Sequence, residues 1–476
     1  MLTDELTHLI RQHLGFEPTA DQWNAMQVFA LFITSRQSMA AMVLRGSAGT
    51  GKTSLAGAMV RTLQQLGQKV VLLAPTGRAA KVFALNAGSP AFTIHRKIYR
   101  QQSALAEAFN LNDNLHHDTL FMVDEASMIA NQGHDTVFGS GRLLDDLVQY
   151  VGSGHNCRLM LIGDKAQLPP VGEQESPALQ ASYLRGYGLS IYECDLDEVV
   201  RQNLQSGILF NATTIRKTII SDSLTQLPHI RFSGFADIQR VPGDELIEML
   251  NTSYSQVGTD ETMVITRSNK RANIYNQGIR NTILGREEEL TTGDMLMIVK
   301  NNYFWIEDQS PNISFIANGD RARVLRVRNC RELYGFRFAD VWLQFPDYDD
   351  YELQATVLCD SLRAEAPSLT REQSDALFNA VMADYEDIPR KADRIKKLRD
   401  DRHFNALQVK YAYATTCHKA QGGQWAHVYI DQGYMTDEML TPDYIHWLYT
   451  AFTRATEKLF LVNWPKTQIA DEDKPD

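Results

Sequence analysis

The stretch GSAGTGKTS, residues 46–54, decides the fold of this chain. An apolar run, AAMVL, ends just before it, and a helix-forming segment, residues 54–66, follows it. The pattern G-x-x-x-x-G-K-[ST] between a strand and a helix predicts a phosphate-binding loop, whereas a chance glycine turn lacks this context. Glycines let backbone N–H groups face a phosphate, and the N-terminus of the helix adds partial positive charge. The residues expected to contact the nucleotide are Gly46, Ser47, Ala48, Gly49, Thr50, Gly51, Lys52, Thr53 and Ser54.

Six more apolar runs also end in polar or glycine-rich loops. They are KVVLLA before Pro75, TLFMV before Asp124, CRLMLI before Gly163, TMVI before Thr266, AHVYI before Asp431 and KLFLV before Asn463. Helical stretches lie between most of them. Buried runs that alternate with helices predict parallel sheets covered on both faces. Ligands bind at the carboxyl ends of the strands in such sheets, so we expect the site in these loops.

The middle of the chain has a different pattern, from about Tyr303 to Phe404. Short alternating runs there predict antiparallel strands. A helix follows, with Thr370 and Gln373 spaced for a capping box, and Pro389 separates it from a second, exposed helix. We therefore predict an insertion of roughly 100 residues within a second α/β domain.

Composition limits the function classes. The chain has 476 residues, of which 44% are apolar, and a net charge of −11, which argues against non-specific coating of nucleic acid but allows a local basic groove. Its five cysteines form no C-x-x-C pair, so we expect reduced thiols in a cytoplasmic protein, without a disulfide framework or a zinc site. No apolar run approaches the ~18 residues that span a bilayer, so no membrane partner is expected. The N-terminal 15 residues predict an amphipathic helix and not a signal peptide.

Two further strand exits carry unusual chemistry. FMVDEAS places Asp124 and Glu125 together, where one carboxylate can hold Mg²⁺ through water and the other can orient and deprotonate an attacking water. GDKAQLPPVG, residues 163–172, would place Gln167 near the γ-phosphate, with Asp164 supporting the loop or the metal. Two prolines stiffen this loop, so a movement at Gln167 would be transmitted. We interpret the loop as a sensor that reports the nucleotide state to bound DNA.

The motif series resembles the superfamily 1 (1B) DNA helicases, most closely the RecD/Dda group. FEPTADQ resembles the adenine-reading Q motif, and APTGRAAKV and TIHR resemble the first motifs that contact single-stranded DNA. GDKAQLPPVG resembles motif III and LDEVVRQ motif IV. YATTCHKAQGGQW and WLYTAFTRATEKL resemble motifs V and VI. The matches follow the family's order across nearly the whole chain.

The resemblance implies ATP and Mg²⁺ as cofactors and assigns residues to roles. The catalytic candidates are Lys52, Asp124, Glu125, Gln167, Arg201 and Arg454, the last two being arginines delivered from the second domain. Besides the phosphate loop, ATP would contact Gln22 and Gly422, and Mg²⁺ would be held by Thr53 and Asp124. The candidates for DNA contact are Pro75, Thr76, Arg78, Thr93, His95, Thr416, His418 and Lys419. Tyr99 and Phe109 are candidates for a strand-separating wedge, although a surface helix and loop explain their segment almost as well.

The resemblance also implies a domain plan for the α/β fold. Residues 1–195 would form RecA-like domain 1A, with a pin insertion (1B) at about 97–117. Residues 196–300 and 405–476 would form RecA-like domain 2A. The inserted domain 2B, residues 301–404, would be SH3-like with added helices. The role of the helical part, residues 370–402, stays open between a DNA contact, a partner surface and a brace for the DNA channel.

The expected activity is that of an ATP-dependent helicase that moves 5′ to 3′ on single-stranded DNA. Its expected partners are single-stranded and fork DNA, with single-strand-binding, replication or recombination proteins as further candidates, and we expect a monomer. One alternative is a DNA-stimulated translocase subunit that does not unwind duplex alone. Another is a DNA-binding protein with an inactive ATPase, which the intact Lys52, Asp124, Glu125 and Arg454 argue against.

Overall fold

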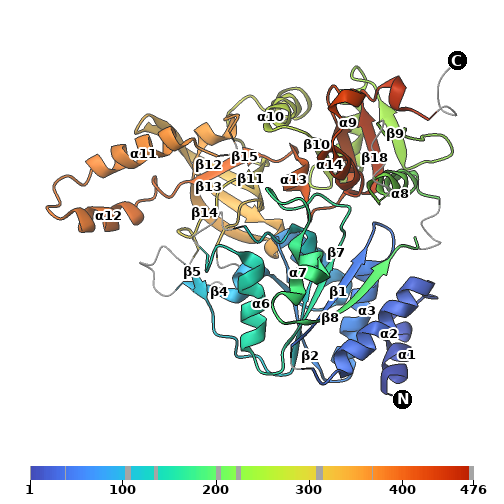
Figure 1. The fold of residues 1–476 in the computed structure, drawn as a ribbon. Coiled ribbons are helices and arrows are strands. Elements are labelled where there is room, and N and C mark those ends of the chain that lie inside the picture. Colours follow the sequence, from blue (N-terminus) through green and yellow to red (C-terminus); the bar gives the residue numbers. More distant parts are fainter. Residues whose placement is uncertain are drawn as a thin grey trace.

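The computed structural model describes residues 2–37, 39–101, 109–132, 138–199, 205–220, 227–306, 315–366 and 368–470. Two parallel sheets lie in two halves of the molecule, and a small barrel lies beside them (Figure 1). The predicted α/β class with two parallel sheets is therefore confirmed. No helix within the described ranges is both long enough and apolar enough to cross a bilayer.

The first sheet has six parallel strands in the order β3-β2-β6-β7-β1-β8. Every apolar run predicted for this half forms one of its strands. The strands are β1 (Ala40–Gly46), β2 (Lys69–Ala74), β3 (Ala91–Thr93), β6 (Thr119–Val123), β7 (Arg158–Gly163) and β8 (Ser190–Leu196). Side chains alternate between its two faces: Met42 and Leu44 pack in one core cluster, whereas Ala41 and Val43 pack in another.

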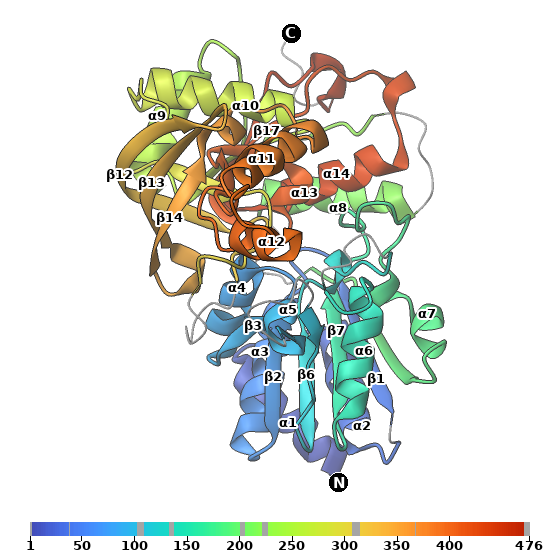
Figure 2. The ribbon, with the colours of Figure 1, turned by 90° about the vertical axis from the view of Figure 1, so that its left-hand side faces the viewer.

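Helices cover both faces of this sheet, as Figure 2 shows. On one face lie α1 (Leu2–Leu14), α2 (Ala20–Thr34), α3 (Lys52–Gln65) and α4 (Gly77–Ala87). On the other lie α5 (Ile94–Ile98), α6 (Leu143–Ser153) and α7 (Ala181–Arg185). Because the strands are buried on both faces, they read as continuous apolar runs and are easily recognised in the sequence.

The second sheet has five parallel strands in the order β16-β10-β17-β18-β9. They are β9 (Ile238–Val241), β10 (Thr262–Thr266), β16 (Ala414–Thr416), β17 (Trp425–Asp431) and β18 (Ala455–Val462). The helices of this half are α8 (Gly207–Ile220), α9 (Leu246–Val257), α10 (Asn269–Gly278), α13 (Cys417–Ala420) and α14 (Pro442–Phe452). Strands β10 and β16 are adjacent in the sheet although about 150 residues separate them, so the intervening chain is an insertion.

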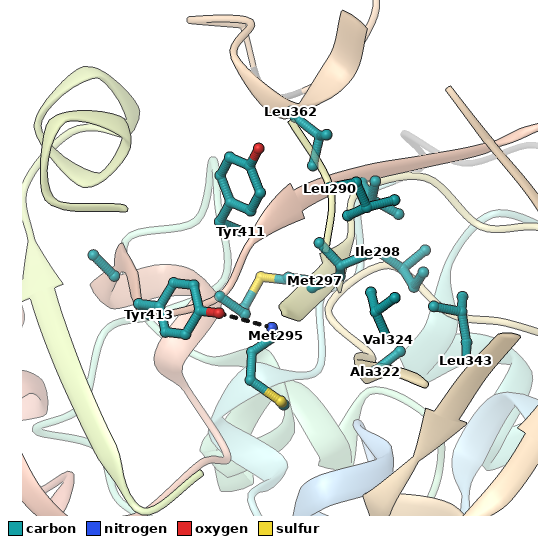
Figure 3. Packing of buried hydrophobic residues seen from close by; sticks show 14 of the residues in the cluster. Leu290, Met295, Met297, Ile298, Ala322, Val324, Leu343, Leu362, Tyr411 and Tyr413 are labelled. Carbon is teal, nitrogen blue, oxygen red and sulfur yellow. Dashed lines mark hydrogen bonds between the residues drawn. The ribbon is translucent and has the colours of Figure 1, made fainter. Parts of the chain in front are cut away.

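A closed five-stranded barrel fills most of this insertion. Its strands are β11 (Met295–Ile298), β12 (Arg321–Leu333), β13 (Phe336–Phe345), β14 (Tyr351–Leu358) and β15 (Leu407–Tyr411). Figure 3 shows its apolar interior, where the backbone N–H of Met295 donates to the hydroxyl of Tyr413 at 3.1 Å. Strands β11 and β15 pair antiparallel and lie just outside the predicted limits 301–404. They connect the barrel directly to the second sheet.

Two helices, α11 (Arg371–Ala383) and α12 (Lys391–Arg399), form an arm on the barrel (Figure 1). The predicted capping box is present, since Thr370 Oγ1 accepts from the N–H of Gln373 and Gln373 Oε1 accepts from the N–H of Thr370. A small core that includes Phe338, Leu377 and Leu398 fixes the arm to the barrel. Both predicted helices are therefore confirmed.

Candidate nucleotide and DNA sites

The phosphate-binding loop joins β1 to α3. Gly49 and Gly51 both have φ of +78°, a left-handed conformation that glycine adopts without strain. Helix α3 begins at Lys52, so its first N–H groups face the loop. Lys52 Nζ donates to the carbonyls of Gly46 at 2.6 Å and Ser47 at 3.0 Å. The Lys52 side chain thus lies over the loop, where the oxygens of a bound phosphate would replace these two carbonyls as its acceptors.

Gln22 is fully buried and supports the loop from α2. Its side-chain amide donates to the carbonyl of Thr50 at 2.9 Å. Its Oε1 accepts from the N–H of Thr19 as part of a capping box at the start of α2. Contact of Gln22 with an adenine base stays a prediction, and such a contact would replace one of these two hydrogen bonds.

The acidic pair follows β6. Asp124 is buried, and Glu125 adopts a left-handed backbone with its N–H donating to Asp124 Oδ1 at 2.9 Å. Burial, with the adjacent charge of Glu125, raises the pKa of Asp124 to about 7, and the ammonium of Lys52 opposes this shift. Such an electrostatically uncompensated carboxylate pair favours a bound cation.

The loop after β7 connects the two halves of the molecule. Tyr449, on α14, donates its hydroxyl proton to Asp164 Oδ2 at 2.6 Å. The same hydroxyl oxygen accepts from the N–H of Ala48 in the phosphate loop at 2.9 Å. A three-residue chain of hydrogen bonds therefore runs from motif III through motif VI to the phosphate loop.

Other bonds hold the motif III loop against the second half. The N–H of Leu168 donates to Thr450 Oγ1 at 2.8 Å, and its carbonyl accepts from the amide of Gln421 at 2.7 Å. Gln167 is buried, and its Oε1 has no hydrogen-bond partner among the described residues. An unpaired Oε1 can accept from water or another donor but not from a phosphate, whose oxygens also accept, so the position of Gln167 near the γ-phosphate stays a prediction.

Of the two arginines predicted to be delivered from the second half, the structure describes Arg454. Arg454 is 1% exposed, and its guanidinium donates to the carbonyls of Thr450 and Gly423 at 3.1 and 3.2 Å. Its side chain is thus held by carbonyls of the second half. Arg201 lies outside the described residues.

Arg216, on α8, is an arginine that contacts the phosphate loop, and no motif of the sequence points to it. Its Nη1 donates to Ser47 Oγ at 3.1 Å, and it pairs with Asp197. Nearby on α8, Leu209 lies so close that a Cβ on Gly49 would meet its Cδ1 at 3.0 Å. Helix α8 therefore covers the loop. The only signal in the sequence that could have found Arg216 is its positive charge in a helix-forming segment.

Several predicted DNA residues lie together at the junction of the first half, the second half and the barrel. A cavity of about 220 Å³ is lined by Thr76, Arg78, His418 and Lys419 from the predicted set. Thr76 caps α4 by accepting from the N–H of Ala79, and burial lowers the pKa of Lys419. Pro75 directly precedes Thr76, and Thr416 is the N-cap residue of α13.

Gly422 lies with this group and not with the phosphate loop. A Cβ at Gly422, which has φ of +71°, would meet Thr76 Oγ1 at 2.9 Å, so glycine allows motif V to approach α4 closely. This approach joins motif V to the first half, and the place of Gly422 among the ATP contacts stays a prediction.

The aromatic candidates form a buried cluster. Tyr99 and Phe109 stand on the antiparallel strands β4 (Tyr99–Gln101) and β5 (Phe109–Leu111), and both are less than 10% exposed. The ring of Phe109 lies 4.6 Å from that of Tyr303, and the ring of His95 lies 4.9 Å from that of Phe138. Burial contradicts a wedge made by Tyr99 and Phe109 themselves, because a wedge must be exposed to split base pairs. The connection between the two strands lies outside the described residues. Thr93, the N-cap of α5, begins the helix that carries His95.

Comparisons with known proteins agree with this geometry. Residues 18–218 match the AAA domain family, and residues 411–462 match the UvrD-like helicase C-terminal domain. The ATP-dependent DNA helicase Dda of Enterobacteria phage T4 is 23% identical over 427 residues, which cover 85% of this chain and 90% of Dda. The ATP-dependent RecD2 DNA helicase of Deinococcus radiodurans is 35% identical over 131 residues, which cover 27% of this chain and 16% of RecD2. The chain thus carries an AAA domain and a UvrD-like helicase C-terminal domain, and it is homologous to the DNA helicases Dda and RecD2.

A solved structure of the Pif1 helicase from Bacteroides, in complex with ADP-AlF3 and ssDNA, is also similar to this chain. Its TM-score is 0.49 at 14% identity, and the match covers 97% of this chain and 95% of the Pif1 chain. The AAA match contains the phosphate loop, the acidic pair and α8, and the UvrD-like match contains Gln421, Tyr449 and Arg454. The hydrogen bonds from Tyr449 to Asp164 and Ala48 therefore join the two matched regions.

Proposed function

We propose that this protein is an ATP-dependent DNA helicase that translocates 5′ to 3′ on single-stranded DNA and separates duplex. One observation carries the proposal: Asp164 and Ala48 of the first half and Tyr449 of the second meet in one hydrogen-bonded chain at the phosphate loop. A nucleotide bound there would contact both halves, so its hydrolysis would change how they fit together. Homology to the ATP-dependent DNA helicases Dda and RecD2 supports the activity, and resemblance alone supports the direction.

The residues at the loop suit ATP with Mg²⁺. Among the described residues, no group of three or more acidic, His or Cys side chains could hold a metal ion. This agrees with Mg²⁺ bound by one or two protein groups, here Thr53 and Asp124, together with phosphate oxygens. The buried Asp124–Glu125 pair, with its raised pKa at Asp124, would be relieved by such a cation. When bound, Mg²⁺ would supply charge neutralisation on the phosphates.

The chain's own residues have separate roles in this proposal. Lys52 leaves its loop carbonyls for phosphate oxygens, Glu125 orients and deprotonates water, and Gln167 senses the γ-phosphate. Arginines from the second half supply the charge that phosphoryl transfer requires. Arg216 lies on the loop in this conformation, whereas Arg454 and Arg201 would act after the halves close.

We further propose that the chain divides into the domains 1A, 2A and 2B, with the barrel as 2B, and that a monomer acts in the cytoplasm beside single-strand-binding or replication proteins. The test is strand separation on duplexes that carry only a 5′ or only a 3′ single-stranded tail, with ATP and Mg²⁺. The proposal expects unwinding from the 5′ tail alone. DNA-stimulated ATP hydrolysis without any unwinding would favour the translocase subunit, and absence of hydrolysis with DNA present would reject both.

A further inference from the structure

The cavity at the three-way junction contains buried hydrogen-bond donors without acceptors. Arg321, the first residue of the barrel strand β12, is 5% exposed, and neither its Nε nor its Nη2 has a partner among the described residues. The Nε of Arg78 and the indole Nε1 of Trp425 also lack partners within the part of the chain described. All three residues line the same cavity of about 220 Å³.

These donors gather around one aromatic ring. The guanidinium carbon of Arg78 lies 4.8 Å from the centroid of the Trp425 ring, and that of Arg321 lies 5.8 Å from it. Both distances are within the range of cation–π attraction. Two cations thus approach each other around a shared indole, and the nearby carboxylates of Asp347 and Glu261 offset part of their repulsion.

Protein carboxylates satisfy these cations poorly. Arg78 reaches Glu261 at 3.6 Å and Asp347 at 4.0 Å, both long for an ion pair. Arg321 makes one bond, at 3.3 Å, to the carbonyl of Asp260. The buried carboxylate of Asp320 accepts from Tyr348 and Ala317. Burying a guanidinium with open donors costs free energy that a ligand recovers.

We propose that Arg78, Arg321 and the indole N–H of Trp425 form a site for one backbone phosphate of single-stranded DNA. A guanidinium fork binds a phosphate through two parallel N–H···O bonds, and a phosphate accepts from several donors at once. Thr76 and Lys419, both predicted DNA residues, line the same cavity. The barrel thereby becomes part of the DNA site through Arg321, a residue that no motif marks. This inference rests on the proposed function, since DNA supplies the phosphate.

The site also lies next to the arginine segment of motif VI. The backbone N–H of Trp425 donates to the carbonyl of Arg454 at 2.9 Å. The guanidinium of Arg454 in turn donates to the carbonyl of Gly423.

The test compares Arg321→Gln with Arg328→Gln in the full-length protein. Arg328 stands on the same strand and contacts a tryptophan, Trp342, at 5.6 Å, but it is exposed and outside the cavity. Affinity for a short fluorescein-labelled oligothymidylate is measured by anisotropy over a range of salt concentrations, and ATP affinity by calorimetry. We expect Arg321→Gln to weaken DNA binding about ten-fold and to reduce the slope of log affinity against log salt concentration by about 0.7. Its ATP affinity should not change, and Arg328→Gln should bind DNA as the wild type does.

The outcomes separate this inference from the proposed function. A folded Arg321→Gln protein that binds DNA as the wild type does would overturn the site. If Arg321→Gln lost ATP affinity and kept its DNA affinity, the site would bind a nucleotide phosphate, and the proposed DNA site would also be overturned. A wild-type protein that binds no DNA would instead reject the proposed function. If Arg321→Gln does not fold, Trp425→Phe decides: it keeps a smaller aromatic ring, loses the N–H, and must weaken DNA binding about three-fold or more.

Discussion

Tyr449 and Asp164 stand 285 residues apart and share a hydrogen bond of 2.6 Å that crosses from one half of the molecule to the other. Asp164 is 3% exposed, and Oδ1 of the same carboxylate accepts from the N–H of Ala166, which fixes the motif III loop. Because the Tyr449 hydroxyl also accepts from Ala48, a displacement of the phosphate loop displaces Tyr449 and Asp164 together. Burial raises the pKa of Tyr449 well above its usual value, so the hydroxyl stays a donor at every working pH.

Replacing Tyr449 with Phe removes this link and keeps the ring. Asp164 Oδ2 then loses its donor in a buried place, which costs about 1–3 kcal/mol. We expect DNA stimulation of ATP hydrolysis to fall about ten-fold, while ATP affinity changes little. Steady-state hydrolysis with and without oligothymidylate measures the effect. Tyr434→Phe, at a residue that is 81% exposed, is the control, and an equal loss there would refute the link.

Lys52→Ala tests the phosphate loop. The lysine side chain lies on the loop, and it neutralises phosphate charge that no other described residue of the loop can. We expect ATP hydrolysis to be abolished and binding of single-stranded DNA to persist. Hydrolysis is followed by phosphate release, and DNA binding by anisotropy in the same preparation. Near-normal turnover would overturn the assignment of the active site.

Arg454 and Arg216, both from the second half, make separable predictions. Because Arg454 is proposed to act only after the halves close, we expect Arg454→Ala to retain ATP binding and to slow hydrolysis by about 10³-fold or more. Arg216→Ala removes the bond to Ser47 that already exists, so we expect weaker ATP binding as well as slower hydrolysis. Calorimetric ATP affinity beside single-turnover rates distinguishes the two. Unchanged turnover in Arg454→Ala would remove it as the delivered arginine.

Local patterns in the sequence predict part of the fold and of the site. The phosphate loop, the strand exits at Asp124 and Gly163 and the capping box at Thr370 each occupy a few consecutive residues, so spacing alone locates them. Buried parallel strands are apolar throughout, and this makes the strands of both sheets recognisable as apolar runs.

The features that the sequence does not predict depend on contacts between distant segments. Arg216, Trp425 and Arg321 acquire meaning only when α8 covers the phosphate loop and the barrel packs on α4. Aromatic residues that flank a polar turn favour a wedge at Tyr99 and Phe109, yet the barrel segment with Tyr303 buries them. No local pattern predicts which aromatic rings a later insertion will cover.

Asp320 gives a pH-dependent prediction for stability. Burial raises its pKa to about 7, against 3.8 when exposed, so the folded protein binds a proton more tightly than the unfolded chain. Stability should therefore fall as pH rises from about 4 to 7 and stay level above that range. In Asp320→Asn this loss of stability is absent, because the amide stays neutral while it can still accept from Ala317 and donate to Tyr348.

We expect the melting temperature of the Asp320→Asn variant to exceed that of the wild type at pH 8, with the difference shrinking towards pH 4. Differential scanning fluorimetry across this range measures it, with the exposed Asp375→Asn as the matched control. A difference that does not change with pH would show that Asp320 is not the group that titrates.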